Sequence, residues 1–254
     1  MGQTRKVPAM RRKTALATAL SAVLSAVLGL ALPSGALAQQ GEESSPQPVV
    51  VELFTSQGCS SCPPADALLK QLAQRPGVIA LALHVDYWDY IGWKDEFAQA
   101  KFSERQRGYA VAAGRRSIYT PEMIVNGVTD VVGARAMKLS AAIAEHAAVP
   151  SQVDLQLERN GDQVLVGAVA DGAEGPFVVQ LVRYTPLRET HITRGENAGK
   201  TLKYANVADE WSVLTRWDGA DALAISADVD AADPVVIIVQ RADSGAIVAA
   251  ARLR

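Results

Sequence analysis

The chain has 254 residues, enough for one or two domains, and its 49% hydrophobic and 20% charged residues allow a buried core and exclude disorder along the whole length. Two cysteines exclude a disulfide-rich scaffold and a four-cysteine zinc site, and three histidines leave few ligands for a multi-histidine metal centre. Residues 1–38 carry five basic residues and no acidic one, which leaves 20 Lys and Arg against 27 Asp and Glu, a charge of −7, in the remainder. Because phosphate binding begins with positive charge, we expect no nucleic-acid partner.

An export signal is predicted at residues 1–38. A basic stretch that ends at Lys13 precedes the apolar run Ala15–Leu32, and the Ala-Leu-Ala sequence at 36–38 fits the small-x-small pattern of a cleavage site. The 18-residue run is also just long enough for a membrane anchor, but it is rich in Ala and Ser and leads directly into the cleavage-type sequence. We therefore expect a periplasmic or secreted protein in an oxidising space, with no membrane association after cleavage. Residues 39–48, rich in Gln, Glu, Ser and Pro, are predicted to form a flexible lead-in.

Residues 49–149 are predicted to form a thioredoxin-like domain, because strand and helix signals alternate along them in the order typical of that core. The first two strands should be parallel through a right-handed crossover. The Asn126-Gly127 pair predicts a tight hairpin turn. The predicted strands are residues 49–54, 78–85, 123–125 and 128–132, and the predicted helices are residues 65–74, 94–113 and 134–148.

Residues 150–254 are predicted to form a C-terminal antiparallel β-sandwich-like domain, so that the expected fold class is α/β followed by a β domain. Pro150 marks the boundary, and Asn160-Gly161 is a turn signal between two alternating segments. Strands at this spacing are typical of a small sandwich. The predicted strands are residues 153–157, 164–169, 177–182, 211–217, 235–239 and 246–253.

The chemistry is predicted at Cys59 and Cys62, between the first strand and the first helix. Because Pro63 and Pro64 are tolerated only in the first turn of a helix, we expect the helix to begin close to residues 59–61. A Cys59 thiolate would then face unpaired N–H groups and the positive end of the helix dipole, which lowers its pKa and makes Cys59, the more exposed of the pair, a nucleophile. Cys62 is placed one turn further to resolve a mixed disulfide at Cys59.

Two other interpretations of the cysteine pair stay open. A purely structural disulfide across four residues contributes only about 2 kcal/mol by the loop-entropy relation, against about 3 kcal/mol for fifteen residues, so a stabilising bridge is expected between more distant segments. Two thiolates with His84 as a third ligand suit copper(I), whereas a closed zinc site requires four ligands. No metal or other cofactor is assigned to the chain from the sequence.

Three segments should converge on the cysteines. The parallel strands end at the same sheet edge, which delivers Cys59 from one strand and His84, Asp86 and Trp88 from the other. The strand after Thr120-Pro121 should run antiparallel, so its start lies at that edge as well. His84 can tune the thiols or act as a base, or it can be an internally hydrogen-bonded histidine. Glu52 can relay the proton of Cys62, or it can point to solvent or be hydrogen-bonded for structure. Trp88 and the neighbouring aromatic residues can form a peptide-binding rim or pack in the core.

These motifs resemble the secreted thioredoxin-like family catalogued as domain of unknown function 1223. The resemblance rests on residues 51–66, 84–90, 92–95, 105–107, 119–121 and 194–202. It implies a thioredoxin-like fold with a C-terminal β extension in exported bacterial proteins, without a proven reaction. By the same likeness, Pro121 takes the position of a cis-proline that faces the cysteines, and the backbone of Thr120 is left to pair with an extended peptide.

Departures from ordinary thioredoxins limit what carries over. Gly58 replaces the tryptophan before the first cysteine, and the acid expected six residues before Cys59 falls on Leu53, with Glu52 one step away. A shift of one residue on a strand changes the face, so Glu52 points to the opposite side of the strand from the position of the thioredoxin acid. The 194–202 stretch can lean on the first half or simply close a turn. The predicted function is an exported thiol–disulfide oxidoreductase that acts on protein or small thiols with an unidentified redox partner; the alternatives are the copper or zinc protein and a non-catalytic binding module.

Overall fold

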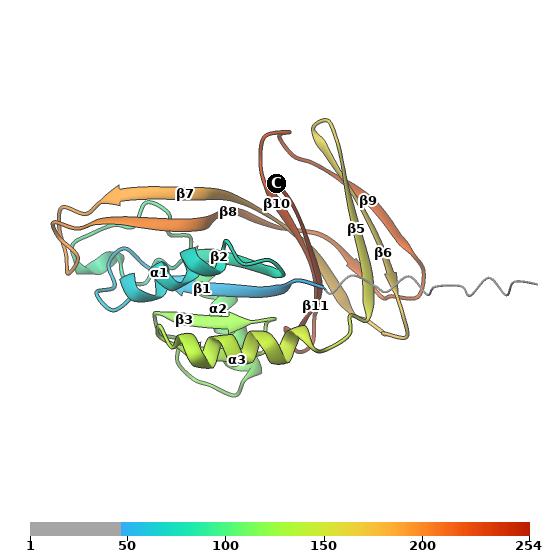
Figure 1. Ribbon diagram of the computed structural model, residues 1–254, viewed down its shortest axis with the longest axis horizontal. Coiled ribbons are helices and arrows are strands. Elements are labelled where there is room, and N and C mark those ends of the chain that lie inside the picture. Colours follow the sequence, from blue (N-terminus) through green and yellow to red (C-terminus); the bar gives the residue numbers. More distant parts are fainter. Residues whose placement is uncertain (1–46) are drawn as a thin grey trace, which may run out of the picture. The chain divides into compact units, whose positions relative to one another are not determined.

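The structure is a computed structural model that describes residues 47–254 (Figure 1). The signal peptide predicted for residues 1–38, and most of the lead-in predicted for residues 39–48, lie outside the described residues. The described part is a mixed α/β fold with one eight-stranded sheet, in the order β11-β10-β7-β8-β2-β1-β3-β4, and one three-stranded sheet, in the order β5-β6-β9. No helix within residues 47–254 has the length and apolarity needed to cross a membrane.

The elements follow the chain in this order: β1 (Val49–Thr55), α1 (Pro63–Leu72), β2 (Val78–His84), the short 3-10 helix η1 (Asp89–Ile91), α2 (Ala100–Ala112), β3 (Glu122–Val125), β4 (Thr129–Val132), α3 (Ala136–Ala147), β5 (Val153–Asn160), β6 (Gln163–Ala170), β7 (Phe177–His191), β8 (Thr201–Trp217), β9 (Leu223–Asp228), β10 (Val235–Arg241) and β11 (Ile247–Leu253).

Strands β1 and β2 are the buried centre of the first half, and all seven residues of each are buried. They pair in parallel from Val49↔Val78 to Thr55↔His84, as the two apolar runs predict, and β3 pairs antiparallel with the other side of β1. The near-continuous apolar character follows from covering both faces of the strands with other elements. Because the parallel strands end together, Thr55 and His84 lie side by side at the edge that leads to the cysteines.

The two faces of β1 contact different helices. Residues Val49, Val51 and Leu53 pack in one apolar cluster with α1 and α3, whereas Val50 and Phe54 pack on the opposite face with side chains of α2. This alternation follows from the period of two in a strand. It decides which polar groups reach the cysteines, because Thr55 shares the α1 face and Glu52 shares the α2 face.

A long hairpin made of β7 and β8 carries the sheet beyond the first half (Figure 1). Its strands pair from Phe177↔Trp217 to His191↔Thr201, and β8 meets β2 in parallel at Ala82↔Val207. The strands predicted at 177–182 and 211–217 are therefore the far ends of much longer strands. The large sheet draws strands from both sides of residue 150.

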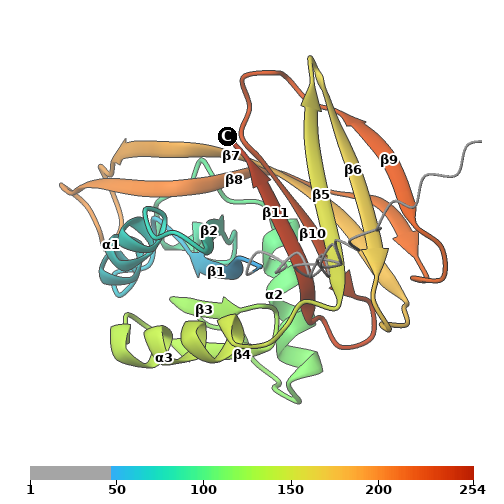
Figure 2. The ribbon, with the colours of Figure 1, turned by 45° about the vertical axis from the view of Figure 1, so that its right-hand side comes forward.

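The three-stranded sheet packs against strands of the large sheet, and Figure 2 shows β5, β6 and β9 alongside β10 and β11. Val153, Val164 and Val166 of the small sheet share an apolar cluster with Phe177 and Ile237 of the large sheet. The second layer expected for a separate sandwich is thus supplied by strands that continue the sheet of the first half. Strand β9 has no counterpart among the predicted strands.

Helix α2 begins at Ala100, six residues later than the predicted start at Lys94. The buried carboxylate of Asp95 explains the delay, because it accepts hydrogen bonds from the backbone N–H groups of Phe97 at 2.9 Å and of Gln57 at 2.8 Å. An aspartate that bonds nearby backbone groups in this way competes with helix formation. The loop before α2 is thereby tied to the segment that carries the cysteines.

Candidate functional site

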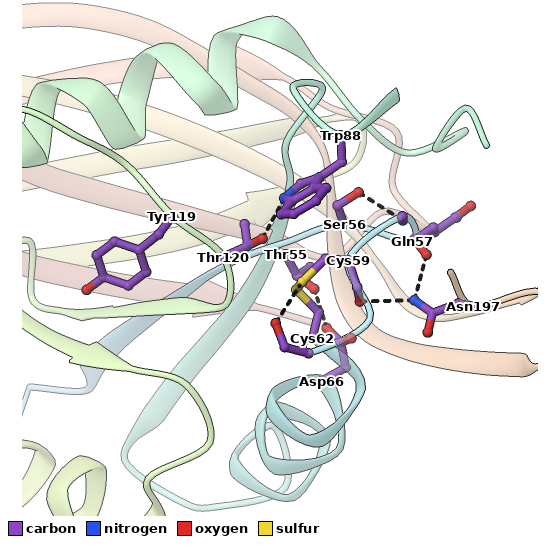
Figure 3. The surroundings of a disulfide bond; sticks show 12 residues. Thr55, Ser56, Gln57, Cys59, Cys62, Asp66, Trp88, Tyr119, Thr120 and Asn197 are labelled. Atoms are coloured by element: carbon purple, nitrogen blue, oxygen red, sulfur yellow. Dashed lines mark hydrogen bonds between the residues drawn. A yellow bond between two sulfur atoms is a disulfide. The ribbon is translucent and has the colours of Figure 1, made fainter. Parts of the chain in front are cut away.

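Cys59 and Cys62 form a disulfide in the turn between β1 and α1, with an S–S distance of 2.11 Å and a Cα–Cα distance of 5.4 Å (Figure 3). Both cysteines have a relative exposure of 0%. The expectation that Cys59 is the more exposed of the two is therefore wrong for the oxidised protein. The two residues between them, Ser60 and Ser61, are exposed.

Helix α1 begins at Pro63, two residues before the start that the apolar pattern predicts, with Cys62 at the N-cap and Pro63 and Pro64 at the first two helical positions. The N-cap directly follows residues 59–61, close to which the start was expected, and the prolines occupy the first turn as expected. The backbone N–H groups of Ala65 and Asp66 both bond to the Cys62 carbonyl, at 2.8 and 3.1 Å, so they are not available to a sulfur.

The turn itself offers one hydrogen-bond donor to the Cys59 sulfur and, among the described residues, two unpaired backbone N–H groups. The Ser61 hydroxyl lies 3.4 Å from Cys59 Sγ, a distance at which it can donate a hydrogen bond to sulfur. Within residues 47–254, the backbone N–H groups of Ser60 and Ser61 have no hydrogen-bonding partner. Successive N–H groups in a turn can stabilise an anion in the same way as a helix start.

A buried carboxylate lies below the disulfide. Asp66 is one helical turn after Cys62, and its Oδ1 accepts a hydrogen bond of 2.8 Å from the Thr55 hydroxyl (Figure 3). Burial raises the pKa of Asp66 to about 7, and the nearby Asp95 carboxylate adds to the rise; His84 and the Thr55 hydroxyl oppose it. The carboxyl therefore exchanges its proton near neutral pH. Sequence reasoning missed this residue.

His84 is fully buried and lies near the Asp66 carboxyl. Its Nδ1 lies 2.7 Å from Asp95 Oδ2, and its ring packs edge-on against Phe97 and Tyr204 at centroid distances of 5.3 and 4.7 Å. Three buried polar atoms on this face have no partner within residues 47–254, namely Asp66 Oδ2, His84 Nε2 and the Tyr204 hydroxyl. Native proteins pair most buried polar atoms, so three unpaired ones in one neighbourhood mark an unusual polar site.

Glu52 lies on the opposite face of β1 from this cluster. Its carboxylate forms an ion pair with Arg105 of α2, with an Nε–Oε1 distance of 2.6 Å, and accepts a hydrogen bond from the Tyr109 hydroxyl. The Arg105 guanidinium in turn lies 3.9 Å from the centre of the Trp211 ring. Glu52 thus belongs to a buried hydrogen-bonded network with a structural role, which is one of the arrangements expected for it.

Asp86 is also tied to α2. Its backbone N–H donates to the Ser103 hydroxyl at 3.3 Å, and that hydroxyl donates back to Asp86 Oδ1 at 2.5 Å. This reciprocal pair anchors the segment after β2 to the start of α2. Asp86 supports the loop that carries Trp88.

Trp88 and the Thr120-Pro121 loop flank the disulfide (Figure 3). The Thr120–Pro121 peptide bond is cis, which confirms the expectation for Pro121. The Trp88 indole Nε1 donates a 2.7 Å hydrogen bond to the Thr120 hydroxyl, so one side chain spans the two loops. A Cβ atom on Gly58 would lie 3.3 Å from the Trp88 Cβ and 3.2 Å from Ile91 Cδ1, so a larger residue before Cys59 would require these side chains to shift. The predicted convergence of three segments is confirmed.

The loop between β7 and β8 also reaches the site. Asn197 is fully buried, and its side-chain amide donates hydrogen bonds of 2.9 Å to the carbonyls of Gln57 and Cys59. The 194–202 stretch therefore packs against the first half of the chain and does not merely close a turn. The family resemblance includes residues 194–202, but no feature of the sequence indicates that Asn197 contacts the cysteine turn.

The comparison with protein families identifies the chain. A family model described as a protein of unknown function, DUF1223, matches residues 50–240. The chain belongs to the DUF1223 family. The X-ray structure of a protein from Agrobacterium tumefaciens is similar to this DUF1223 chain with a TM-score of 0.70 and 32% identity, and the match covers 81% of this chain and 93% of that one.

A thioredoxin from Malassezia sympodialis matches 41% of the DUF1223 chain and 80% of its own length, with 25% identity and a TM-score of 0.27. None of the curated proteins is significantly similar to the chain.

The side chains of the DUF1223 site bear on the metal-binding hypothesis. Among residues 47–254, no group of three or more His, Cys, Asp and Glu side chains is arranged to hold a metal ion. His84, the third ligand in the copper or zinc hypothesis, directs Nδ1 at Asp95 and is packed between Phe97 and Tyr204. What the arrangement offers chemically is a disulfide, a nearby carboxyl that titrates near neutrality, and a polar turn.

Proposed function

We propose that this DUF1223 protein is a thiol–disulfide oxidoreductase that uses Cys59 and Cys62 as its redox pair. The observation that carries the proposal is the disulfide at a strand–helix junction with the buried carboxyl of Asp66, whose pKa burial raises to about 7, one turn behind it. A group that accepts a proton near pH 7 suits thiol exchange, because only the thiolate attacks a disulfide. The substrates proposed are protein or small-molecule thiols and disulfides.

A purely stabilising role explains the disulfide less well. The bond closes a loop of only four residues, for which the loop-entropy relation gives about 2 kcal/mol. The same turn is already held by the Asn197 amide and by Asp95, which bond its backbone at 2.8–2.9 Å. The turn therefore has other means of keeping its shape.

The exchange is proposed to run in two steps. In the reduced form, the Cys59 thiolate attacks one sulfur of a substrate disulfide, a Cys59–substrate disulfide forms, and the other substrate sulfur leaves as a thiolate. Cys62 then passes its proton to Asp66 and attacks the Cys59 sulfur, which re-forms the Cys59–Cys62 bond and releases the second substrate thiolate. Two electrons pass to the substrate, and the reverse sequence oxidises a substrate dithiol. A thiol or disulfide redox partner restores the starting state.

Substrate access is proposed to require movement of Trp88. Because both cysteines are buried in the oxidised form, the Trp88–Thr120 hydrogen bond must open before another sulfur can approach in line. The Thr120 backbone N–H and C=O have no partner within residues 47–254, so they are free to pair with an extended peptide. This arrangement supports a protein or peptide substrate.

We also propose that residues 49–149 have a thioredoxin-like fold, residues 150–254 form its C-terminal β domain, and the protein acts in the periplasm or outside the cell. The connection β1-α1-β2 followed by β3, β4 and α3, with the sheet order β2-β1-β3-β4, supports the first point. The basic and apolar pattern of residues 1–38 supports export, and a disulfide is stable in an oxidising compartment.

The experiment that tests the proposal measures disulfide reduction and dithiol oxidation by the chain without residues 1–38, alongside Cys59→Ser and Cys62→Ser. We expect exchange in the parent and its loss in Cys59→Ser. Equal exchange rates in the parent and Cys59→Ser would refute an enzymatic role.

Full burial of both cysteines favours one second candidate, a binding protein whose disulfide is inert. It predicts that the parent resists glutathione at any ratio of thiol to disulfide and that Cys59→Ala keeps the biological function. Fold alone does not decide between the two, since the same scaffold carries many functions.

A further inference from the structure

The loop of residues 192–200 contacts the cysteine turn through one buried side chain. Asn197 has a relative exposure of 0%, and its Nδ2 donates to the Gln57 carbonyl and to the Cys59 carbonyl, each at 2.9 Å (Figure 3). The two carbonyls lie on either side of Gly58. A single amide therefore bridges the backbone of the segment that carries Cys59.

Asn197 is itself held in a fixed orientation. Lys200 Nζ donates to Asn197 Oδ1 at 2.9 Å, which identifies the amide oxygen and directs both N–H groups at the cysteine turn. The Lys200 backbone N–H bonds to the Asn197 carbonyl at 3.1 Å, and Gly199 N–H bonds to the Ile192 carbonyl at 2.7 Å. The loop is thus a tight turn at the end of the β7–β8 hairpin.

A second contact fixes the loop against the segment after β2. Gly195 has a φ of +75°, and a Cβ there would lie 3.3 Å from the Trp93 Cβ. The Trp93 indole donates a 2.7 Å hydrogen bond to Gln57 Oε1. Gln57 therefore accepts one hydrogen bond from Trp93 at its side chain and one from Asn197 at its backbone carbonyl.

We infer that Asn197 is a positioning residue, which holds residues 57–59 in the geometry that keeps Cys59 Sγ within bonding distance of Cys62 Sγ. The second half of the chain thereby sets the redox equilibrium of a pair that belongs to the first half. Two thiols held close together have a high effective concentration, which favours the disulfide over the dithiol. The physiological meaning of this device rests on the proposed function, but the equilibrium itself does not.

The test measures the equilibrium in which two glutathione thiols reduce the Cys59–Cys62 disulfide and become one glutathione disulfide. It uses the chain without residues 1–38 and two variants, Asn197→Asp, which keeps the size but removes both donors, and Asn197→Ala. Both variants are expected to shift the equilibrium about tenfold toward the dithiol, which corresponds to about 30 mV in reduction potential. Glu196→Gln, at an exposed neighbouring position, is the matched control and is expected to change nothing.

The inference is overturned if both variants fold and stay within about twofold of the parent, or if Glu196→Gln shifts the equilibrium equally. Should neither variant fold, hydrogen exchange of the Asn197 side-chain amide in the parent decides. Slow exchange in the oxidised form, faster after reduction, supports the inference, and rapid exchange in the oxidised form contradicts it. A parent without exchange activity whose equilibrium still moves with Asn197 would remove the proposed function and leave this inference standing.

Discussion

The hydroxyl of Thr55, the last residue of β1, donates a 2.8 Å hydrogen bond to Asp66 in the first turns of α1. Both residues are buried, so the bond joins strand to helix around the cysteine turn. It places a carboxyl below the disulfide on the same face of the sheet as His84. The chemistry proposed for the site depends on this placement, because a carboxylate at the surface would not titrate near pH 7.

Replacement of Asp66 by Asn should change how stability depends on pH. The native carboxyl binds its proton up to about pH 7, whereas the unfolded one releases it near pH 3.8, so the parent loses stability as pH rises from about 4 to about 7. The shift corresponds to a loss on the order of 4 kcal/mol, complete above pH 7. Asp66→Asn should lack this loss, so urea unfolding of the oxidised forms at pH 5 and pH 8 should show a larger difference in the parent.

The same variant separates the chemical role of Asp66 from its cost in stability. If Asp66 accepts the Cys62 proton, Asp66→Asn should slow the resolving step at pH 7 by roughly 10²-fold or more, within the usual range for a general base. Thr55→Val is the control for the lost hydrogen bond. An unchanged resolving rate in Asp66→Asn would remove the carboxyl from the mechanism.

Ser61→Ala should raise the pKa of the Cys59 thiol in the reduced protein. The Ser61 hydroxyl lies 3.4 Å from Cys59 Sγ, and a hydrogen bond worth about 1 kcal/mol to the thiolate corresponds to roughly 0.7 pH units. Alkylation with iodoacetamide across pH measures the change. Ser60→Ala, at the adjacent exposed position, is the matched control, and an equal effect of both variants would contradict a specific contact.

Trp88→Ala should speed attack on the disulfide by a small reductant. The indole spans the gap to Thr120 through a 2.7 Å hydrogen bond, so its removal should raise the rate of reduction by dithiothreitol by about tenfold, in line with the loss of one hydrogen bond and its packing. Tyr90→Ala tests specificity, because Tyr90 is 82% exposed on the same loop. Equal rates in all three proteins would show that Trp88 does not limit access.

Glu52→Gln should reduce stability without changing the redox properties. The substitution leaves Arg105 buried beside a neutral group, and breaking a buried ion pair typically costs about 3–5 kcal/mol. Thermal unfolding should register the loss, while the glutathione equilibrium of Cys59 and Cys62 should stay within about twofold of the parent. If the glutathione equilibrium changes while the thermal stability does not, Glu52 takes part in the redox mechanism.

The first half of the fold could be predicted because its signals are local. Two apolar runs around a helix that starts with two prolines predict β1, α1 and β2, and the strand ends then bring His84 to the cysteine edge. The face of Glu52, opposite to that of the thioredoxin acid position at Leu53, follows from the period of two in a strand. The cis peptide before Pro121 came from the family resemblance and not from local propensity.

The rest depends on contacts that no local pattern encodes. Charged residues interrupt the apolar pattern of β7 and β8, and their pairing becomes visible only across the hairpin, where Arg183 meets Glu210 and Arg188 meets Asp209. An aspartate in the first turn of a helix usually marks the favourable end of the dipole at a surface, so Asp66 gave no sign of burial. The Asn197–Cys59 contact joins residues 138 positions apart.

The measurement that tests the central claim most directly is capture of a mixed disulfide. Purified chain without residues 1–38, as the reduced Cys62→Ser variant, is incubated with oxidised glutathione and analysed by mass spectrometry, with reduced Cys59→Ser alongside it. The account predicts a stable one-to-one glutathione adduct at Cys59 and, over the same time, much less at Cys62. No adduct at Cys59, or equal labelling of the two sulfurs, would contradict it.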